Sequence, residues 1–541
     1  MRKINVLDCT LRDGGYVNEC HFGRENIKKI VRNLNEANID IIECGFLKME
    51  DSPKGDDYSS YSDLSELSFL EDEIDANKRY ALMMLCETCD ADKLPVCKEN
   101  KFNLIRLAFH KRDAKKAITD AKKILDKGYE LFLQPTATMG YSDDEILELI
   151  NICNEIGPDA VAIVDTFGEM LGSDIIRYSK LFDKYLDSNI TLAFHSHNNI
   201  QTAYSNALLF IDNTSADRDI VIDSSILGMG RGAGNLCSEL IIDYLNKKHN
   251  KNYTIYPLLE IADNILEPIR QEKYWGYSLA YYLSGINHCH PKYCIYFSDK
   301  KTLTTKDLCL LMETISEDKK IDFDLEYADE LYYSYLSRNI SSNECYDRLK
   351  TIIGNKNVLL LGPGKTIKDN LDNIIELSSQ KNIYFTISVN SIFPFVVDAA
   401  FISNRKRYKD IDPDLNCCYL LTSNIDDCNN LQNKIVFDYG DVLAKELQIT
   451  DNALLLILNI LKKAGISNVT LAGFDGYSHK QSQNYYDNKL LYLIDKTKVY
   501  ELNKMLTDYI SLYSNDLKLS FITETRYCKE NTKCLIKEKK I

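Results

Sequence analysis

Short apolar runs alternate with longer segments whose apolar residues recur every three or four positions in the first half of the chain. Short runs predict buried strands, and the wider spacing predicts helices with one buried face. The predicted strands are Lys3–Leu7, Ile39–Gly45, Arg79–Leu85, Leu104–Ala108, Glu130–Gln134, Ala160–Asp165, Ile190–His195 and Asp219–Ser225. The predicted helices include Glu25–Ala37, Ala114–Lys127, Asp143–Ile156, Asp174–Leu186, Ile200–Ile211 and Leu236–Lys248. This order predicts an α/β fold, an N-terminal parallel (β/α)8 TIM barrel, which uses about 250 residues.

A barrel of this kind carries its active site at the carboxyl ends of the strands. Polar residues stand at these ends in the sequence. Arg12 and Asp13 follow the first strand, Glu43 ends the second, and Thr166 follows the sixth. The seventh strand ends at His195 and His197, and the eighth is followed by the glycine-rich loop 228–235. The prediction is therefore that one rim of the barrel gathers these groups.

The rest of the chain predicts a helical extension and a second α/β domain. Residues 255–350 are mostly helical in pattern and rich in tyrosine, and they connect the barrel, 1–254, to the second domain, 351–541. Strands are predicted there at Val358–Leu361, Ile383–Val389, Ala399–Ile402, Cys418–Leu421, Ile435–Asp438 and Val469–Ala472, with a helix at Ala453–Ala464. We expect a Rossmann-like, doubly wound sheet that binds ligands beyond the strand ends.

Composition and charge narrow the function classes. The net charge of −15 argues against nucleic acid as the main partner. There is no apolar run of about 18 residues, so no membrane span is expected. The chain enters a strand at once, so no signal peptide is expected. The 17 cysteines, an odd number in a long chain, fit reduced thiols and a cytoplasmic location. We also expect a homo-oligomer.

Asp13, His195 and His197 form a candidate metal site. On a strand, residues two apart share one face, so the two imidazoles point the same way. One carboxylate with two imidazoles suits a divalent metal with open positions for substrate. Mn²⁺ or Mg²⁺ fits if substrate oxygens complete the shell, and Zn²⁺ is possible. The alternative is that both histidines are structural and that Asp13 only pairs with Arg12.

Three motifs together resemble those of the metal-dependent aldolase and Claisen-condensation barrels. They are Asp8-x-Thr10-Leu11-Arg12-Asp13-Gly14, His195-x-His197, and Gly228-x-Gly230-x-Gly232-x-Gly234-Asn235. That superfamily includes 4-hydroxy-2-oxovalerate aldolase, 3-hydroxy-3-methylglutaryl-CoA lyase and 2-isopropylmalate synthase. The resemblance covers about residues 1–290. It implies that Asp13, His195 and His197 bind the metal and that Arg12 steadies an enolate oxygen.

The aldolase branch is the most similar. The segment Val164–Gly168 resembles the aldolase turn where a serine binds the substrate carboxylate, which would give that role to Thr166. Gly276-Tyr277-x-x-x-Tyr281 resembles the segment that places a tyrosine over the aldolase site. Tyr281 is then a catalytic candidate, with Tyr277 close behind. Alternatively, both tyrosines are core aromatics at helical spacing.

Two residues near the Arg12-Asp13 motif, Tyr16 and His21, are candidates for the general base. Aldolases of this type carry a catalytic histidine where this chain has Tyr16. A tyrosine, with a reference pKa near 10, is a poor base but can donate a hydrogen bond. His21 either supplies the base or is an ordinary loop histidine. Glu43 and Asn235 are further substrate-binding candidates, although Glu43 could equally serve only to pair with Arg12.

A glycine turn opens the second domain. Gly362-Pro363-Gly364-Lys365 precedes a predicted helix, where Gly362, Gly364 and Lys365 could hold a phosphate or simply form a tight turn. The P-loop and dinucleotide fingerprints both fail here. The domain weakly resembles the Rossmann-like sialyltransferase and pterin-pyrophosphokinase-like proteins of surface-glycan pathways at Gly362-Pro363-Gly364, Asn390, Ser403-Asn404-Arg405 and Gly473-Phe474-Asp475-Gly476. That resemblance implies a nucleotide or nucleotide-sugar partner.

The main functional prediction is a divalent-metal-dependent aldolase or lyase that acts on a small 2-oxo acid and an aldehyde through a pyruvate-type enolate. One alternative is an acyl-CoA condensing transferase of the 2-isopropylmalate synthase type. Another is a non-catalytic barrel that serves as a binding module in surface-glycan synthesis.

Overall fold

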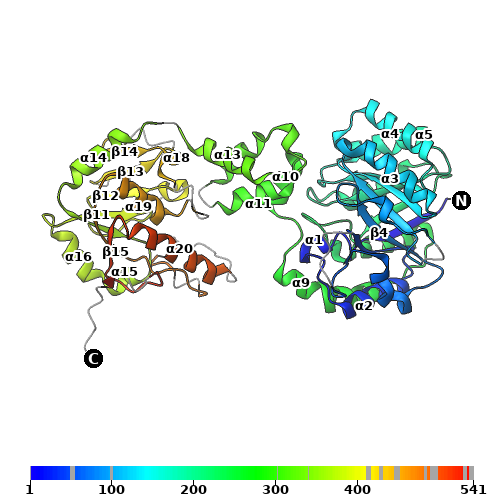
Figure 1. The fold of residues 1–541 in the computed structure, drawn as a ribbon, viewed down its shortest axis with the longest axis horizontal. Coiled ribbons are helices and arrows are strands. Elements are labelled where there is room, and N and C mark those ends of the chain that lie inside the picture. The colour runs from blue at the N-terminus through cyan, green and yellow to red at the C-terminus, as the bar shows by residue number, and fades with distance from the viewer. Residues whose placement is uncertain are drawn as a thin grey trace. The chain divides into compact units, whose positions relative to one another are not determined.

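The computed structural model describes residues 2–48, 55–97, 101–300, 303–338, 340–409, 416–425, 431–443, 447, 451–480, 484–487, 498–527 and 533–534. The chain divides into two compact units, Met1–Ile295 with Ser316–Phe323, and Tyr296–Ile315 with Asp324–Ile541 (Figure 1). The segment predicted as a connector, 255–350, is thus shared between them. Among the helices that are described, none is both long and apolar enough to cross a membrane.

Eight parallel strands close into a barrel in the first unit, which confirms the predicted TIM barrel. They are β1 (Ile4–Asp8), β2 (Ile41–Leu47), β4 (Arg79–Leu85), β5 (Leu104–Phe109), β6 (Glu130–Pro135), β7 (Ala160–Asp165), β8 (Thr191–Ser196) and β9 (Ile220–Ser224). Strand β1 pairs with both β9 and β2, which closes the ring. The short strand β3 (Ser60–Tyr61) pairs with the end of β2. This partner carries β2 two residues beyond its predicted end at Gly45.

Helices surround the barrel (blue to green in Figure 1). They are α1 (Gly15–Asn18), α2 (Arg24–Glu36), α3 (Ala114–Asp126), α4 (Asp143–Ile156), α5 (Gly172–Tyr185), α6 (Ala203–Asn213), α7 (Ser238–His249), α8 (Tyr256–Ile261), α9 (Glu267–Glu272) and α10 (Leu279–Ile286). The boundary between the two units falls inside the next helix, α11 (Pro291–Asp299). Local sequence sets their ends. Helix α4 begins with a capping box between Ser142 and Glu145 and ends at Gly157, whose φ of 65° suits glycine.

Alternation along the strands builds the barrel interior. One interior layer is apolar and includes Leu7, Ile41, Ala81, Leu104, Phe132, Ala160, Ala193 and Val221. A strand turns the same face inward every second residue. The next inward positions toward the carboxyl ends are Glu43, Arg106, His195 and Asp223, all buried. The core thus changes from apolar to charged within one step along the strands, just below the rim.

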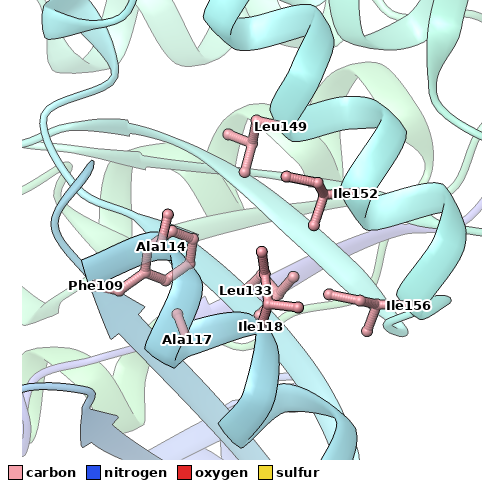
Figure 2. Close-up of a pocket in the computed structure, with 8 residues that line it drawn as sticks. All are labelled: Phe109, Ala114, Ala117, Ile118, Leu133, Leu149, Ile152 and Ile156. Carbon is pink, nitrogen blue, oxygen red and sulfur yellow. The ribbon is translucent and has the colours of Figure 1, made fainter. Parts of the chain in front are cut away.

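Outside the strands, the packing between α3 and α4 leaves a small apolar cavity (Figure 2). Its volume is about 20 Å³, and the lining residues are Phe109, Ala114, Ala117, Ile118, Leu133, Leu149, Ile152 and Ile156. A space this size could hold one water, but a water needs two or more polar partners. An apolar lining of this kind makes it a packing gap and not a ligand site.

The second unit contains a wholly parallel sheet. Its order is β14-β13-β12-β11-β10-β15-β16-β17, so the order reverses at β10. The strands are β10 (Asn357–Leu361), β11 (Tyr384–Val389), β12 (Ala399–Ile402), β13 (Cys418–Thr422), β14 (Lys434–Phe437), β15 (Asn468–Ala472), β16 (Lys518–Phe521) and β17 (Lys533–Cys534). The helices are α12 (Thr305–Glu313), α13 (Leu325–Leu336), α14 (Asn343–Ile353), α15 (Thr366–Asp369), α16 (Leu371–Ser379), α17 (Arg405–Tyr408), α18 (Tyr439–Val442), α19 (Ala453–Lys463) and α20 (Val499–Tyr513). The pattern had not predicted α20, β16 or β17.

Arg218 holds the amino-terminal end of β9 against the turn that precedes β8. Its guanidinium donates to the Asp183 carboxylate and to the carbonyls of Asp183, Leu186, Asp187 and Ile190.

We expect Arg218→Met to lower the stability of the barrel by about 3 kcal/mol, because it leaves several buried acceptors unpaired. Urea denaturation followed by circular dichroism measures this. Arg177→Met, at a half-exposed ion pair on α5, is the matched control and should change stability little.

Candidate metal centre and active site

Asp13, His195 and His197 come together at the carboxyl rim of the barrel and are all buried. Their ligand atoms lie within 4.8 Å of one another. The Oδ2 atom of Asp13 is 3.6 Å from Nε2 of His195 and 4.0 Å from Nε2 of His197. Among the described residues this is the one such group of three possible ligands. A carboxylate oxygen and two imidazole nitrogens at this spacing can hold a divalent metal.

The other ring nitrogen of each histidine is anchored. Nδ1 of His195 lies 3.0 Å from Oδ2 of Asp223, and Nδ1 of His197 lies 3.2 Å from the carbonyl oxygen of Arg231. Both partners accept a hydrogen bond, so each Nδ1 carries a proton. In the neutral form of each ring, which is the form that binds a metal, the lone pair of Nε2 points toward Asp13. Metal-binding histidines are oriented in this way in known sites. The residues present therefore fit a metal.

The charges around Asp13, His195 and His197, which we call the triad, set the protonation state of each member. Burial opposes ionisation of Asp13, but Arg12 and the two histidines outweigh it and hold the pKa of Asp13 well below its usual range. Burial, together with the neighbouring cations, lowers the pKa of His197 to about 3, so this imidazole is neutral. Burial also lowers the pKa of His195, but its hydrogen bonds to Asp13 and Asp223 outweigh burial, and the pKa of His195 is raised.

A buried network of ion pairs joins the triad to the interior of the barrel. Arg12 donates to Asp13 through Nη1 and, at 2.7 Å, to Glu43 through Nε. Arg106 donates to the same Glu43 oxygen at 2.9 Å and also pairs with Asp223. Since Asp223 holds His195, the network fixes a metal ligand at one end and Arg12 at the other. Glu43 thus pairs with both arginines and not with Arg12 alone.

The glycine-rich loop after β9 closes over the triad. The backbone N–H of Arg231 donates to Oδ1 of Asp13 at 3.1 Å. A Cβ at Gly230 would lie 2.8 Å from the same oxygen, so only glycine lets the loop approach this closely. Asn235 donates to the carbonyl of Met229 at 3.3 Å within the loop. Trp275 donates to the carbonyl of Leu227 and pins the start of the loop.

Tyr16 and His21, the candidates for the general base, lie in different surroundings. Tyr16 sits at the mouth with 44% of its surface exposed, and loss of solvation around its hydroxyl raises its pKa. His21 is exposed, and its ring lies 4.9 Å from that of Tyr58. In the described part of the chain, no hydrogen bond joins His21 to the triad.

Helix α10 covers the rim beside the triad. Ser284 and Gly285 face Asn199 of the loop after β8: the Asn199 amide reaches the Ser284 hydroxyl at 3.5 Å, and a Cβ at Gly285 would lie 3.4 Å from that of Asn199. Tyr281 lies one turn earlier, on the face that carries Ser284 and Gly285, and is half-buried. Thr166 is buried after β7, where its hydroxyl oxygen accepts the N–H of Ala137 at 2.7 Å.

Sequence reasoning missed four residues of the site: Arg106, Asn199, Asp223 and Arg231. Two of them carried a signal. Arg106 is the single charge inside the apolar strand β5, and Asp223 is the single charge inside β9. A lone charge at an inward position of a buried strand costs free energy unless it is paired. Asn199 and Arg231 lie in loops and gave no comparable signal.

The glycine turn of the second unit is occupied by its own chain. The N–H groups of Gly362 and Gly364 donate to the carbonyls of Ala472 and Gly473 at 2.8 Å. The Asp475 carboxylate accepts the N–H and the hydroxyl of Thr366 at the start of α15. Lys365 is exposed. A phosphate at this turn would lie close to the Asp475 carboxylate, which already accepts the hydrogen bonds that the N–H and hydroxyl of Thr366 can donate.

The barrel is similar in sequence to known aldolases. A family model described as HMGL-like matches residues 98–265. A 4-hydroxy-2-oxovalerate aldolase of Geobacillus genomosp. 3 is 26% identical over 49% of this chain and 77% of the relative. One from Thermomicrobium roseum is 29% identical over 49% of this chain and 73% of the relative. Among solved structures, the N-terminal domain of a putative aldolase from Bacteroides vulgatus is 29% identical, with a TM-score of 0.48, and covers 54% of this chain and 96% of that one.

We expect Asp223→Asn to weaken metal binding by about 10- to 100-fold, because the neutral amide leaves Arg106 with one carboxylate partner, Glu43, and holds His195 less firmly. Isothermal titration with Mn²⁺ measures the affinity. The matched control is Asp8→Asn, which changes another buried carboxylate of the barrel, one that is hydrogen-bonded to Ser238 and Thr10 and not to the triad. Equal losses in both variants would contradict the role given to Asp223.

Metal binding should depend on pH through His195. Its pKa is raised in the metal-free protein, so below that pKa a proton occupies the imidazole and must leave when a metal binds. The affinity should rise by about tenfold per pH unit below the raised pKa and level off above it. Titrations in buffers of different ionisation enthalpy should register about one released proton. Proton release that stays at zero as the pH falls would contradict this assignment.

Proposed function

We propose that the barrel cleaves or forms a carbon–carbon bond through the enolate of a pyruvate-type 2-oxo acid. The match of residues 98–265 to the HMGL-like family model and the likeness to 4-hydroxy-2-oxovalerate aldolases support this proposal. The observation that carries the proposal is the buried triad of Asp13, His195 and His197 with Arg12 beside it. The names of the relatives support a 4-hydroxy-2-oxo acid as the substrate class.

Asp13, His195 and His197 would hold the metal. The proposed metal is Mn²⁺ or Mg²⁺. A ligand set of one carboxylate oxygen and two imidazoles, completed by oxygens of the substrate, supports this choice. When bound, such a cation withdraws electron density from the carboxylate and keto oxygens of a 2-oxo acid and so favours its enolate.

Arg12 supplies a second positive charge to the enolate oxygen. Its Nε and Nη1 are fixed on Glu43 and Asp13, and in the described part of the chain Nη2 has no hydrogen-bond partner. Arg12 is only 5% exposed, so a bond from Nη2 to a substrate oxygen would form away from bulk water and be correspondingly strong. Thr166 is suited to the substrate carboxylate, because its oxygen accepts from Ala137 and its hydrogen remains available.

Cleavage would break the C3–C4 bond of the substrate. The C4 hydroxyl gives its proton to a general base and becomes the aldehyde, the bonding pair of the C3–C4 bond enters the enolate, and return of a proton from that base to C3 gives the 2-oxo acid. Tyr16 has a raised pKa, so it stays protonated at neutral pH. We therefore assign it hydrogen-bond donation to the oxygen at C4 and not the role of base. Tyr281 stays a candidate for the other side of the same oxygen.

For the second unit, we retain a nucleotide or nucleotide sugar as the proposed ligand. The reversal of strand order at β10 supports a site at that edge of the sheet. The exposed side chain of Lys365, not the amides of Gly362 and Gly364, would then meet the phosphate, since those amides already donate within the chain.

Exchange of the C3 protons of pyruvate with D₂O, followed by NMR, tests the enolate proposal. Exchange should stop after chelation and return with Mn²⁺ or Mg²⁺. His195→Ala and Arg12→Ala should lower its rate by about 100-fold or more, since the first removes a proposed metal ligand and the second a positive charge near the enolate. His249→Ala, on the outer helix α7, is the matched control and should exchange normally. Exchange that persists without metal would refute the proposal.

A further inference from the structure

Arg231 is held at the mouth of the barrel by its backbone. Its N–H donates to Asp13 at 3.1 Å, and its carbonyl lies 3.2 Å from Nδ1 of His197. These two bonds place the Cα of residue 231 directly beside the triad whatever its side chain does. The side chain is half-buried and extends from the loop over Tyr16.

The guanidinium of Arg231 lacks an anionic partner in the described part of the chain. Its Cζ lies 5.7 Å from the centroid of the Tyr16 ring, a cation–π distance. By contrast, Arg12 and Arg106 each pair with two carboxylates. Stacking on a ring occupies the face of a guanidinium and leaves its N–H edge available for a planar or tetrahedral anion.

Arg231 acts on Tyr16 together with Arg12. Burial raises the pKa of Tyr16, and the charges of Arg231 and Arg12 oppose that rise, so both cations lie close to this tyrosine. His290, in the segment after α10, lies within range of the charge of Arg231; burial together with that charge lowers the pKa of this histidine to about 3, so its imidazole is neutral and does not neutralise an anion or a cation. An anion at the mouth would therefore meet an unneutralised cation.

We propose that Arg231 binds an anionic group, a carboxylate or a phosphate, on the aldehyde half of the substrate. This inference rests on the proposed function. The enolate half lies at the triad beside Arg12, which is 5% exposed, so the other half extends toward Tyr16, which is 44% exposed. Arg231 lies on that outer side. The natural acceptor is thus an aldehyde that carries a negative charge and not a small neutral one.

Aldol addition of pyruvate to matched aldehydes tests the inference on the full-length protein. The pairs are butanal with 4-oxobutanoate, and glyceraldehyde with glyceraldehyde 3-phosphate. The anionic member of at least one pair should have the higher kcat/KM, by about tenfold or more, as expected for a charge-assisted contact. The pair with the larger ratio identifies the carboxylate or the phosphate. No preference in either pair would overturn the inference.

Variants separate this role from others. Arg231→Gln should reduce the preference for the anionic aldehyde by about tenfold, mainly through its KM, and Arg231→Lys should restore part of it. Arg177→Gln, which removes an arginine charge from the outer helix α5, should keep the preference. Equal losses for both aldehydes in Arg231→Gln, or a raised KM for pyruvate alone, would overturn the inference.

The outcomes also separate the inference from the proposed function. If the wild-type protein exchanges the C3 protons of pyruvate but treats both members of each pair alike, the enolate proposal stands and the role of Arg231 fails. If it shows neither exchange nor addition, the enolate proposal itself fails, and the inference with it.

Discussion

The buried ion-pair network between Arg12, Glu43, Arg106 and Asp223 is the constraint on which the rest of the active site depends. Arg106, Glu43 and Asp223 stand at inward positions of the barrel strands, one step above the apolar layer, and Arg12 reaches Glu43 from the loop after β1. Charges there are tolerated only because they are paired and hydrogen-bonded. Since the network ends on His195 and on Arg12, the same pairing orients a candidate metal ligand and the cation that we propose for substrate binding. Its components act as a unit and not as separate residues.

Much of this architecture could be predicted from the sequence, for identifiable physical reasons. The strand pattern gave the barrel, because parallel buried strands are nearly continuous apolar runs. The triad could be predicted because His195 and His197 occupy one face of a strand. Arg231 could not be, since a loop arginine is normally solvated, and only the fold brings its backbone to Asp13. Helix α20 and strands β16 and β17, at the edge of the second sheet, were also missed.

Tyr16 shows how one substitution can leave a chemistry intact while changing its details. The motif around Arg12 and Asp13 resembles that of the aldolases, whereas the position of their histidine holds a phenol. Its raised pKa removes the base and leaves a hydrogen-bond donor, and its ring provides a surface for Arg231. The change from imidazole to phenol therefore affects both proton transfer and the shape of the mouth. The enolate half of the proposed reaction does not depend on it.

The loop after β9 divides the work of residue 231 between its backbone and its side chain. The N–H and carbonyl of this residue hold Asp13 and His197, and every amino acid except proline supplies both groups. A substitution of residue 231 therefore keeps the backbone bonds to the candidate metal ligands, while the side chain proposed to contact the acceptor aldehyde can change. A barrel built in this way can diverge toward new aldehydes through single codon changes, without rebuilding the chemistry beneath them.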